Sequence, residues 1–217
     1  MKKILLVDDH PLLREGLARL IGAQVGFTVC GMAATVQEAL ALVDSEHPDL
    51  IITDLILPGR NGLELIKDLG ATHPHLPVIV LSMHDELMYA ERVLRAGGRG
   101  YVMKDTPPER LVQAINVVLA GGVFASQALA DHFLQTLVPA RCSPKPSFPL
   151  ERLTDRELEV FELIGQAKGN QEIATQLHIS PRTLDAHRAH IREKLGLADG
   201  NELIRYAIRW VEVGNGL

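Results

Sequence analysis

The stretch Asp49-Leu50-Ile51-Ile52-Thr53-Asp54-Leu55-Ile56-Leu57-Pro58 decides how the first half of the chain folds. A short apolar run with β-branched residues, followed by an acid and then a proline and glycine turn, indicates a strand buried on both faces of a parallel sheet. Asp54 then stands at the carboxyl end of that strand, which is the edge of an open α/β sheet where ligands bind. Asp54 is therefore the first candidate for a functional residue.

Residues 1–121 alternate between short apolar runs and amphipathic stretches. Five strands alternating with five helices predict a parallel sheet covered by helices on both faces. The flavodoxin-like strand order 2-1-3-4-5 is the natural solution for a sheet this small. The expected strands are 4–7, 27–32, 50–53, 78–81 and 100–103, and the expected helices are 11–21, 36–45, 62–69, 87–96 and 107–119.

Residues 122–149 form a predicted connection between two domains. A helix is expected over 126–137, and four prolines follow within the eleven residues 139–149. Proline at that density makes a semi-rigid, extended linker. We therefore place a domain boundary in this segment.

Residues 150–217 have helical patterns only. Thr154 and Glu157 have the spacing of a capping box, and Ser180-Pro181 combines a cap with a proline at the first helical position. Helices are expected after Thr154 and over 172–177, 181–195 and 202–213. A tight turn before the third helix indicates a small all-α, four-helix domain of the helix-turn-helix type.

Composition places the chain among ordinary globular proteins: 217 residues, 47% hydrophobic, 23% charged and a net charge of −5. The two cysteines are far apart and match no metal spacing, which favours a reducing cytoplasm. No apolar run approaches the roughly 18 residues of a membrane span. We therefore expect a cytoplasmic protein without a membrane partner.

Polar residues follow four of the predicted strands: Asp8 and Asp9 the first, Asp54 the third, Ser82 the fourth and Lys104 the fifth. Because parallel strands end at one edge of the sheet, these side chains should converge. Three carboxylates repel one another unless a cation joins them, and Mg²⁺ takes oxygen ligands and bridges to phosphate. A hydroxyl and an ammonium can neutralise phosphoryl oxygens. This set could receive a phosphoryl group on Asp54.

These residues, with Pro58, Gly62 and Tyr101, resemble the receiver domain of two-component response regulators. The resemblance implies that Asp54 is the phosphoacceptor, that Ser82 and Lys104 contact the phosphoryl group, and that Tyr101 is an aromatic switch. It also implies Mg²⁺, or another divalent cation, bound by Asp9, Asp54 and the backbone carbonyl of Ile56, with Asp8 in support. One departure is Asp105, where many receivers have proline; a cis peptide bond costs more before a non-proline residue.

The predicted helix 181–195 has an apolar face and an arginine-rich face. Leu184, Ile191 and Leu195 repeat at helical spacing, and His187 falls near the boundary between the faces. Three arginines on one face suit phosphate and guanine contacts. The basic character is local, because residues 150–217 contain 9 Lys and Arg against 11 Asp and Glu. The opposite face carries Arg182, Asp185, Arg188, Ala189 and Arg192.

A wider pattern resembles the LuxR-type helix-turn-helix: Leu153-Thr154-Asp155-Arg156-Glu157, Asn170-Gln171-Glu172-Ile173-Ala174, Thr183-Leu184 and Ile191-Arg192-Glu193-Lys194-Leu195. With the receiver it is similar to the NarL/FixJ group of response regulators. The resemblance implies that the third helix enters the major groove and that the last helix either helps dimerisation or packs within the domain. Asp185 and Gln171 depart from lysines common in the family. The expected DNA contacts are Arg182, Thr183, Asp185, His187, Arg188, Arg192 and Lys194.

The expected function is that of a transcription factor, not an enzyme, which accepts a phosphoryl group on Asp54 from a sensor histidine kinase. Phosphorylation would control homodimerisation and binding to DNA. One alternative is a regulator that works without phosphorylation, or a protein-interaction module with a receiver fold. Another is a Mg²⁺-dependent phosphohydrolase, which needs a second acid near the nucleophile; Ile56 occupies the position two residues after Asp54.

Overall fold

The computed structural model describes residues 1–84, 86–127, 129–131 and 149–214. The chain divides into two compact units, Met1–Val138 and Pro139–Leu217. Three of the four linker prolines, and most of the helix expected over 126–137, lie outside the described residues. The linker bounds 122–149 therefore stay a prediction, and each unit is described by itself.

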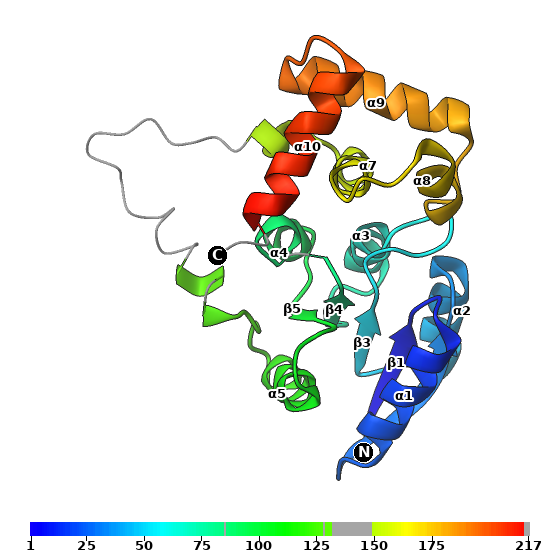
Figure 1. Ribbon diagram of the computed structural model, residues 1–217. Helices are drawn as coiled ribbons and strands as arrows, with labels where there is room; N and C mark the ends of the chain where they lie inside the picture. Colours follow the sequence, from blue (N-terminus) through cyan, green and yellow to red (C-terminus); the bar gives the residue numbers. More distant parts are fainter. Residues whose placement is uncertain (85, 128, 132–148, 215–217) are drawn as a thin grey trace. The chain divides into compact units, whose positions relative to one another are not determined.

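The first unit contains a five-stranded parallel sheet in the order β2-β1-β3-β4-β5, which confirms the flavodoxin-like prediction (Figure 1). Parallel pairing places Val7 of β1 beside Thr53 of β3, and Ser82 of β4 beside Met103 of β5. The strand ends that carry the candidate residues are thus neighbours in the sheet. The strands are β1 Lys2–Val7, β2 Phe27–Ala33, β3 Leu50–Thr53, β4 Val78–Ser82 and β5 Gly100–Met103.

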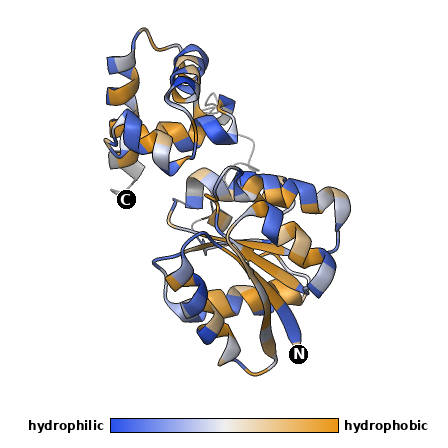
Figure 2. Cartoon of the chain, turned by 90° about the vertical axis from the view of Figure 1, so that its right-hand side faces the viewer, coloured by the Kyte–Doolittle hydropathy of each residue, from blue (hydrophilic) through white to orange (hydrophobic). Residues whose placement is uncertain are grey.

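Helices cover both faces of this sheet, and its strands are apolar on both sides (Figure 2). On one face, α1 and α5 bury Leu17, Ile21, Leu111 and Ile115 against the strands. On the other face, α2, α3 and α4 pack side by side. The helices are α1 Pro11–Gly22, α2 Val36–Glu46, α3 Gly62–Thr72, α4 Glu86–Arg95 and α5 Pro108–Leu119.

The second unit is helical, as predicted, and its helix starts follow the capping signals. Thr154 and Glu157 form both bonds of the capping box, and the Ser180 side chain caps α9. The last helix begins two residues earlier than expected, because the Asp199 carboxylate accepts a hydrogen bond from the Glu202 N–H (2.8 Å). The elements are η1 Pro149–Arg152, α7 Asp155–Gly165, α8 Asn170–Gln176, α9 Pro181–Leu195 and α10 Gly200–Gly214.

The departure at Asp105 leaves the backbone regular, since every peptide bond in the described residues is trans. Lys104 and Asp105 are therefore joined by an ordinary trans bond at the end of β5. Among the described residues, none of the helices has the length and apolar character needed to cross a bilayer.

Candidate functional site

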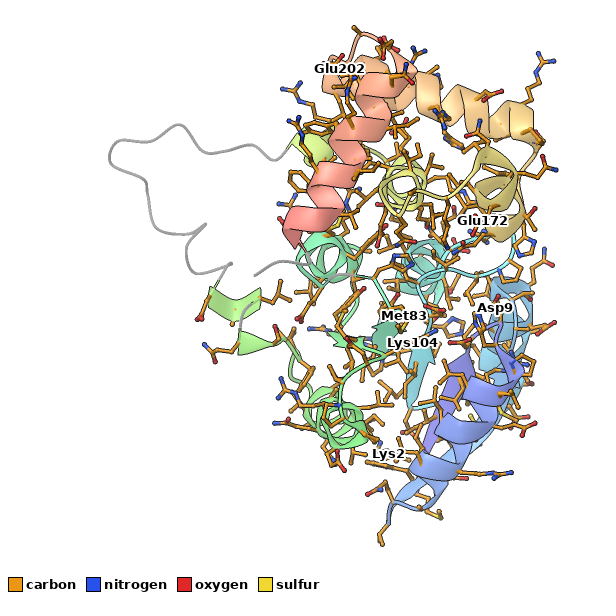
Figure 3. All side chains as sticks on the ribbon, in the orientation of Figure 1. Lys2, Asp9, Met83, Lys104, Glu172 and Glu202 are labelled. Carbon is orange, nitrogen blue, oxygen red and sulfur yellow. The ribbon has the colours of Figure 1, made fainter. Side chains whose placement is uncertain are left out.

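Backbone hydrogen bonds extend past the ends of the strands and fix the positions of the candidate residues. The Asp8 N–H donates to the Ala33 carbonyl (3.1 Å), and the Asp54 N–H donates to the Val7 carbonyl (2.7 Å). On the other side of β3, the Lys104 N–H donates to the Ser82 carbonyl (2.8 Å). Asp9, Met83 and Lys104 consequently lie at one end of the sheet, and Lys2 lies at the other (Figure 3).

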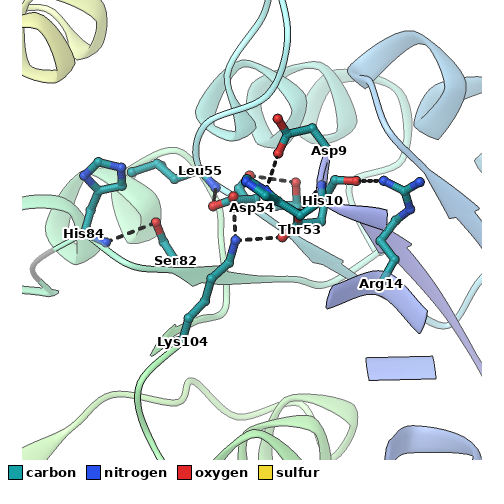
Figure 4. A network of polar contacts seen from close by, with 10 residues as sticks. Asp9, His10, Arg14, Thr53, Asp54, Leu55, Ser82, His84 and Lys104 are labelled. Atoms are coloured by element: carbon teal, nitrogen blue, oxygen red, sulfur yellow. Dashed lines mark hydrogen bonds and ion pairs between the residues drawn. The ribbon is translucent and has the colours of Figure 1, made fainter. Parts of the chain in front are cut away.

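Lys104 joins two of the three acids directly (Figure 4). Its Nζ lies 2.7 Å from Asp8 Oδ2 and 2.6 Å from Asp54 Oδ2. The other oxygen of Asp54 accepts a hydrogen bond from the Leu55 N–H at 2.6 Å. All three charged side chains are largely buried: Lys104 is 9% exposed, Asp54 8% and Asp8 4%. The convergence predicted from the strand ends is confirmed for these residues.

Burial and charge pull the pKa values of this cluster in opposite directions. Burial raises the pKa of Asp54 above its ordinary value, and the ammonium of Lys104 opposes that shift only in part. Burial alone would lower the pKa of Lys104, but the charges and hydrogen bonds of Asp54 and Asp8 outweigh it, so the pKa of Lys104 is raised. Lys104 is therefore positively charged at neutral pH and lies against the buried carboxylate of Asp54.

The acids also have the arrangement of a cation site. Asp8, Asp9, His10 and Asp54 each offer a ligand atom, and these atoms lie within 4.8 Å of one another. Asp9 Oδ1 is buried without a well-directed hydrogen bond, although the Nδ1 of His10 lies 2.7 Å away. A divalent ion with a preference for oxygen, such as Mg²⁺, fits this donor set. His10 is the member of the cluster that the sequence argument missed, although it directly follows the two acids.

Ser82 and Tyr101 are connected through the loop that follows β4. The Ser82 hydroxyl is buried and accepts a hydrogen bond from the His84 N–H (3.3 Å). The Tyr101 hydroxyl donates to the His84 carbonyl (2.7 Å), and the side chain is 1% exposed. One residue of the loop thus contacts both predicted site residues, and a displacement of Ser82 would reach Tyr101 through His84. Ile56 lies in the loop between β3 and α3, half-buried.

In the second unit, α9 presents the side chains expected to contact DNA. Leu184 and Ile191 are buried and hold the helix against its own unit, while Arg182, Thr183 and Asp185 are exposed. His187 is half-buried, and burial together with the charge of Arg156 lowers its pKa. His187 is therefore neutral at pH 7 and offers a hydrogen bond rather than a charge.

Three of the predicted DNA contacts, Arg188, Arg192 and Lys194, are half-buried, and two of these have partners within the unit. An Nη of Arg188 donates to Asn170 Oδ1 at the start of α8 (2.6 Å). The Nζ of Lys194 lies 2.6 Å from Glu157 Oε2, and that carboxylate is only 4% exposed. The bond to Glu157 gives Lys194 a clear structural role, holding the end of α9 to the start of α7.

Known protein families match segments in both units of the chain. Residues 4–116, more than half of the chain, match the response regulator receiver domain, and residues 151–207 match the bacterial regulatory proteins of the luxR family. The chain is a response regulator of the NarL/FixJ type. This family consists of transcription factors, which excludes the phosphohydrolase considered above.

Relatives of this response regulator cover both units. The oxygen regulatory protein NreC of Staphylococcus aureus (strain MRSA252) is 34% identical over 210 residues, 95% of this chain and 97% of NreC. A two-component response regulator of the LuxR family from Aurantimonas sp. SI85-9A1 is 36% identical, with a TM-score of 0.59 over 62% of this chain and 96% of that one. Two RcsB dimers bound to two parallel DNAs give 25% identity and a TM-score of 0.57, over 94% of this chain and 96% of that one.

The buried Glu157 is expected to stabilise the DNA-binding unit of this response regulator. Burial alone would raise the pKa of Glu157, but hydrogen bonds from Lys194 and Thr154 outweigh it and lower the pKa. Glu157→Gln should therefore cost about 1–2 kcal/mol at pH 7. Because the folded pKa is depressed, that stability is present above about pH 4.3 and is lost as the pH falls through the folded value.

Fluorescence offers a selective measurement for Glu157→Gln, because Trp210 of α10 is the only tryptophan in the chain. Urea denaturation followed by Trp210 emission at several pH values would give the difference. A matched control is Glu172→Gln, an exposed glutamate on α8. Equal midpoints for wild type and Glu157→Gln at pH 7 would show that the negative charge of Glu157 and its contact with Lys194 contribute nothing.

Proposed function

We propose that this response regulator accepts a phosphoryl group on Asp54 from a sensor histidine kinase and thereby controls dimerisation and sequence-specific DNA binding. The observation that carries the proposal is the buried carboxylate of Asp54, held by Lys104 at an edge shared with two further acids. Ligands bind at this edge of an open α/β sheet. The buried ammonium of Lys104 can neutralise the oxygens of an incoming phosphoryl group there.

The reaction is a transfer between two nucleophiles. A carboxylate oxygen of Asp54 forms a bond to phosphorus as the bond from phosphorus to the kinase's histidine nitrogen breaks, and the histidine leaves with the electron pair. The transferring group carries charge on three equatorial oxygens, so catalysis consists of positioning and charge stabilisation. The ammonium of Lys104 and the hydroxyl of Ser82 are placed to contact those oxygens. The raised pKa of Asp54 makes its oxygen a stronger nucleophile than that of an ordinary exposed aspartate.

A divalent cation would be held by Asp9, Asp54 and the carbonyl of Ile56, with Asp8 in support. When bound, it supplies positive charge against the phosphoryl oxygens and relieves the repulsion among the acids. The chain itself orients this set, because the backbone bonds at the ends of β1 and β3 fix Asp8 and Asp54 side by side.

The conformational change that follows phosphorylation begins at Ser82 and ends at the surface of α4 and β5. If its hydroxyl turns to donate to a phosphoryl oxygen, its present bond from the His84 N–H is lost. The His84 carbonyl, which holds the Tyr101 hydroxyl, shifts with the loop. The surface of α4 and β5 then changes, and this biases the equilibrium between monomer and dimer.

DNA binding is assigned to α9 because its exposed face carries Arg182 and the half-buried Arg188 and Arg192 on one side. Support comes from the luxR-family match and from RcsB, which is similar over most of the chain and has been solved as dimers bound to DNA. A dimer would present two such helices and favour paired half-sites. Binding to DNA places the working protein in the cytoplasm.

Selection of bound DNA tests the whole proposal. The full chain would be treated with Mg²⁺ and a small phosphodonor such as acetyl phosphate, mixed with genomic fragments, and recovered with the bound DNA. We expect enrichment of a limited set of fragments that increases on phosphorylation and weakens with salt. Enrichment independent of the phosphodonor would favour a phosphorylation-independent regulator, and no enrichment would favour a protein-interaction module.

Arg188→Ala is expected to weaken specific DNA binding by about 1–3 kcal/mol without unfolding the unit. The side chain lies on the side of α9 that we propose to face DNA and is held by Asn170, so its loss removes a positioned cation. A gel-shift titration at fixed salt measures the change, and Trp210 fluorescence checks folding. The matched control is Arg205→Ala, an exposed arginine on α10. Unchanged affinity would exclude Arg188 from the DNA contacts.

A further inference from the structure

His10 occupies a position that helix formation alone does not explain. It is the N-cap residue of α1, but its side chain makes no capping hydrogen bond. Ser, Thr, Asp and Asn are the residues that serve this position well. Pro11 restricts His10 to extended backbone, and its φ of −87° and ψ of 106° agree. The His-Pro pair therefore fixes the backbone from which the imidazole projects, and the capping role is unused.

The imidazole is directed onto the acids of the phosphorylation site. Its Nδ1 lies 2.7 Å from Asp9 Oδ1 and 3.1 Å from Asp8 Oδ1, and the His10 N–H also donates to Asp8 Oδ1 (2.8 Å). One nitrogen thus stands between the two carboxylates that face the cation site. The ring remains accessible, with 69% of the side chain exposed, so it can turn about its own bonds to meet a ligand.

A simple ion pair with Asp8 and Asp9 is the weaker explanation. Ion pairs with one partner this exposed contribute little to stability. Asp8 already has the buried ammonium of Lys104 as its counter-ion. Asp9 Oδ1 stays without a well-directed hydrogen bond even with the imidazole beside it, which is a common condition of an atom that ligates an ion.

We infer that His10 contributes its Nδ1 as an additional ligand of the divalent cation in this pocket, alongside the oxygens of Asp9 and Asp54. This inference rests on the proposed function, since the cation is the one that serves phosphorylation of Asp54. A nitrogen ligand changes which divalent cations the pocket selects. Carboxylates suit Mg²⁺ and Mn²⁺ alike, whereas an imidazole nitrogen suits transition metals, so His10 shifts the preference of the pocket from Mg²⁺ toward first-row transition metals.

Mn²⁺ is the probe for this ligand, because its electron spin reports directly bound nitrogen. Mn²⁺ would be titrated into the full chain by EPR, and the bound ion examined by electron spin-echo envelope modulation. We expect imidazole nitrogen coupling in the wild type, and none in His10→Gln. The Mn²⁺ affinity of His10→Gln should fall roughly tenfold, while the Mg²⁺ affinity, measured by competition, changes much less. His75→Gln, an exposed histidine before β4, is the control and should behave like the wild type.

Two further results separate this inference from the proposed function. Mn²⁺ binding that is lost in Asp9→Asn but shows no nitrogen coupling in the wild type would overturn the role of His10 and leave the phosphorylation site intact. Nitrogen coupling that persists in His10→Gln would also overturn it. Binding that is unaffected by Asp9→Asn would place the cation elsewhere and contradict the proposed cation site as well.

Discussion

Asp54→Asn is expected to abolish phosphoryl transfer to this response regulator. The amide has nearly the shape of the carboxylate but is not a nucleophile, so incorporation from acetyl phosphate should fall by several orders of magnitude. Lys104 keeps Asp8 as a partner in this variant, and the buried charge removed at Asp54 was itself costly, so the receiver should remain folded. Intact-protein mass spectrometry after a fixed exposure to Mg²⁺ and acetyl phosphate measures the phosphorylated fraction.

Asp44→Asn is the matched control for this experiment. Asp44 is an exposed aspartate near the end of α2, where it lies 3.4 Å from His73, before the start of β3 and not at a strand end. Its replacement should leave incorporation at the wild-type level. A phosphorylated Asp54→Asn variant would show that another residue is the phosphoacceptor, and the assignment of Asp54 would be wrong.

Gly62→Ala is expected to damage the phosphorylation site through the backbone. A Cβ at Gly62, the first residue of α3, would lie 2.2 Å from the carbonyl oxygen of Asp54 and 3.2 Å from the Cα of Leu55. The Gly62 N–H also donates to the Leu55 carbonyl (2.7 Å), so α3 cannot withdraw without losing that bond. Overpacking of this kind costs about 1–3 kcal/mol. The displaced Asp54 should be phosphorylated much more slowly.

Hydrogen exchange followed by mass spectrometry would locate the effect of Gly62→Ala in the segment from β3 to α3. The control is Gly70→Ala on the same helix, where the nearest heavy atom to a new Cβ is the Ala96 carbonyl at 4.0 Å. Alanine there should stabilise the helix by about 0.5–1 kcal/mol. Wild-type exchange and wild-type phosphorylation in Gly62→Ala would mean that α3 yields without cost.

The fold could be predicted from local patterns because each strand of a parallel sheet is short, apolar and followed by a helix. Thr154 with Glu157, and Ser180 with Pro181, begin their helices as the sequence indicated. The start of α10 differs from the prediction for a reason of the same kind: Asp199 caps that helix, which therefore begins at Gly200 and not at Glu202.

The candidate site could be predicted only in part. Convergence of Asp8, Asp54 and Lys104 follows from strand order, and strand order follows from the βα alternation. His10 could not be predicted as a site residue, because an imidazole before a proline has no fixed direction until α1 is placed against β1. The same limit applies to Lys194, which was expected to face DNA and instead contacts the buried Glu157 on α7.

The strand β3, which ends directly before Asp54, shows what the sequence and the tertiary structure each determine. The sequence alone determined that a buried strand would end in an acid at a ligand-binding edge, because alternation, burial and turn signals are local properties. Only the tertiary structure decided what surrounds that acid: Lys104 at 2.6 Å, the backbone of Gly62 against its carbonyl, and His10 beside Asp9. These contacts join residues up to 50 positions apart. Side-chain direction across such separations is set by packing, which no local pattern specifies.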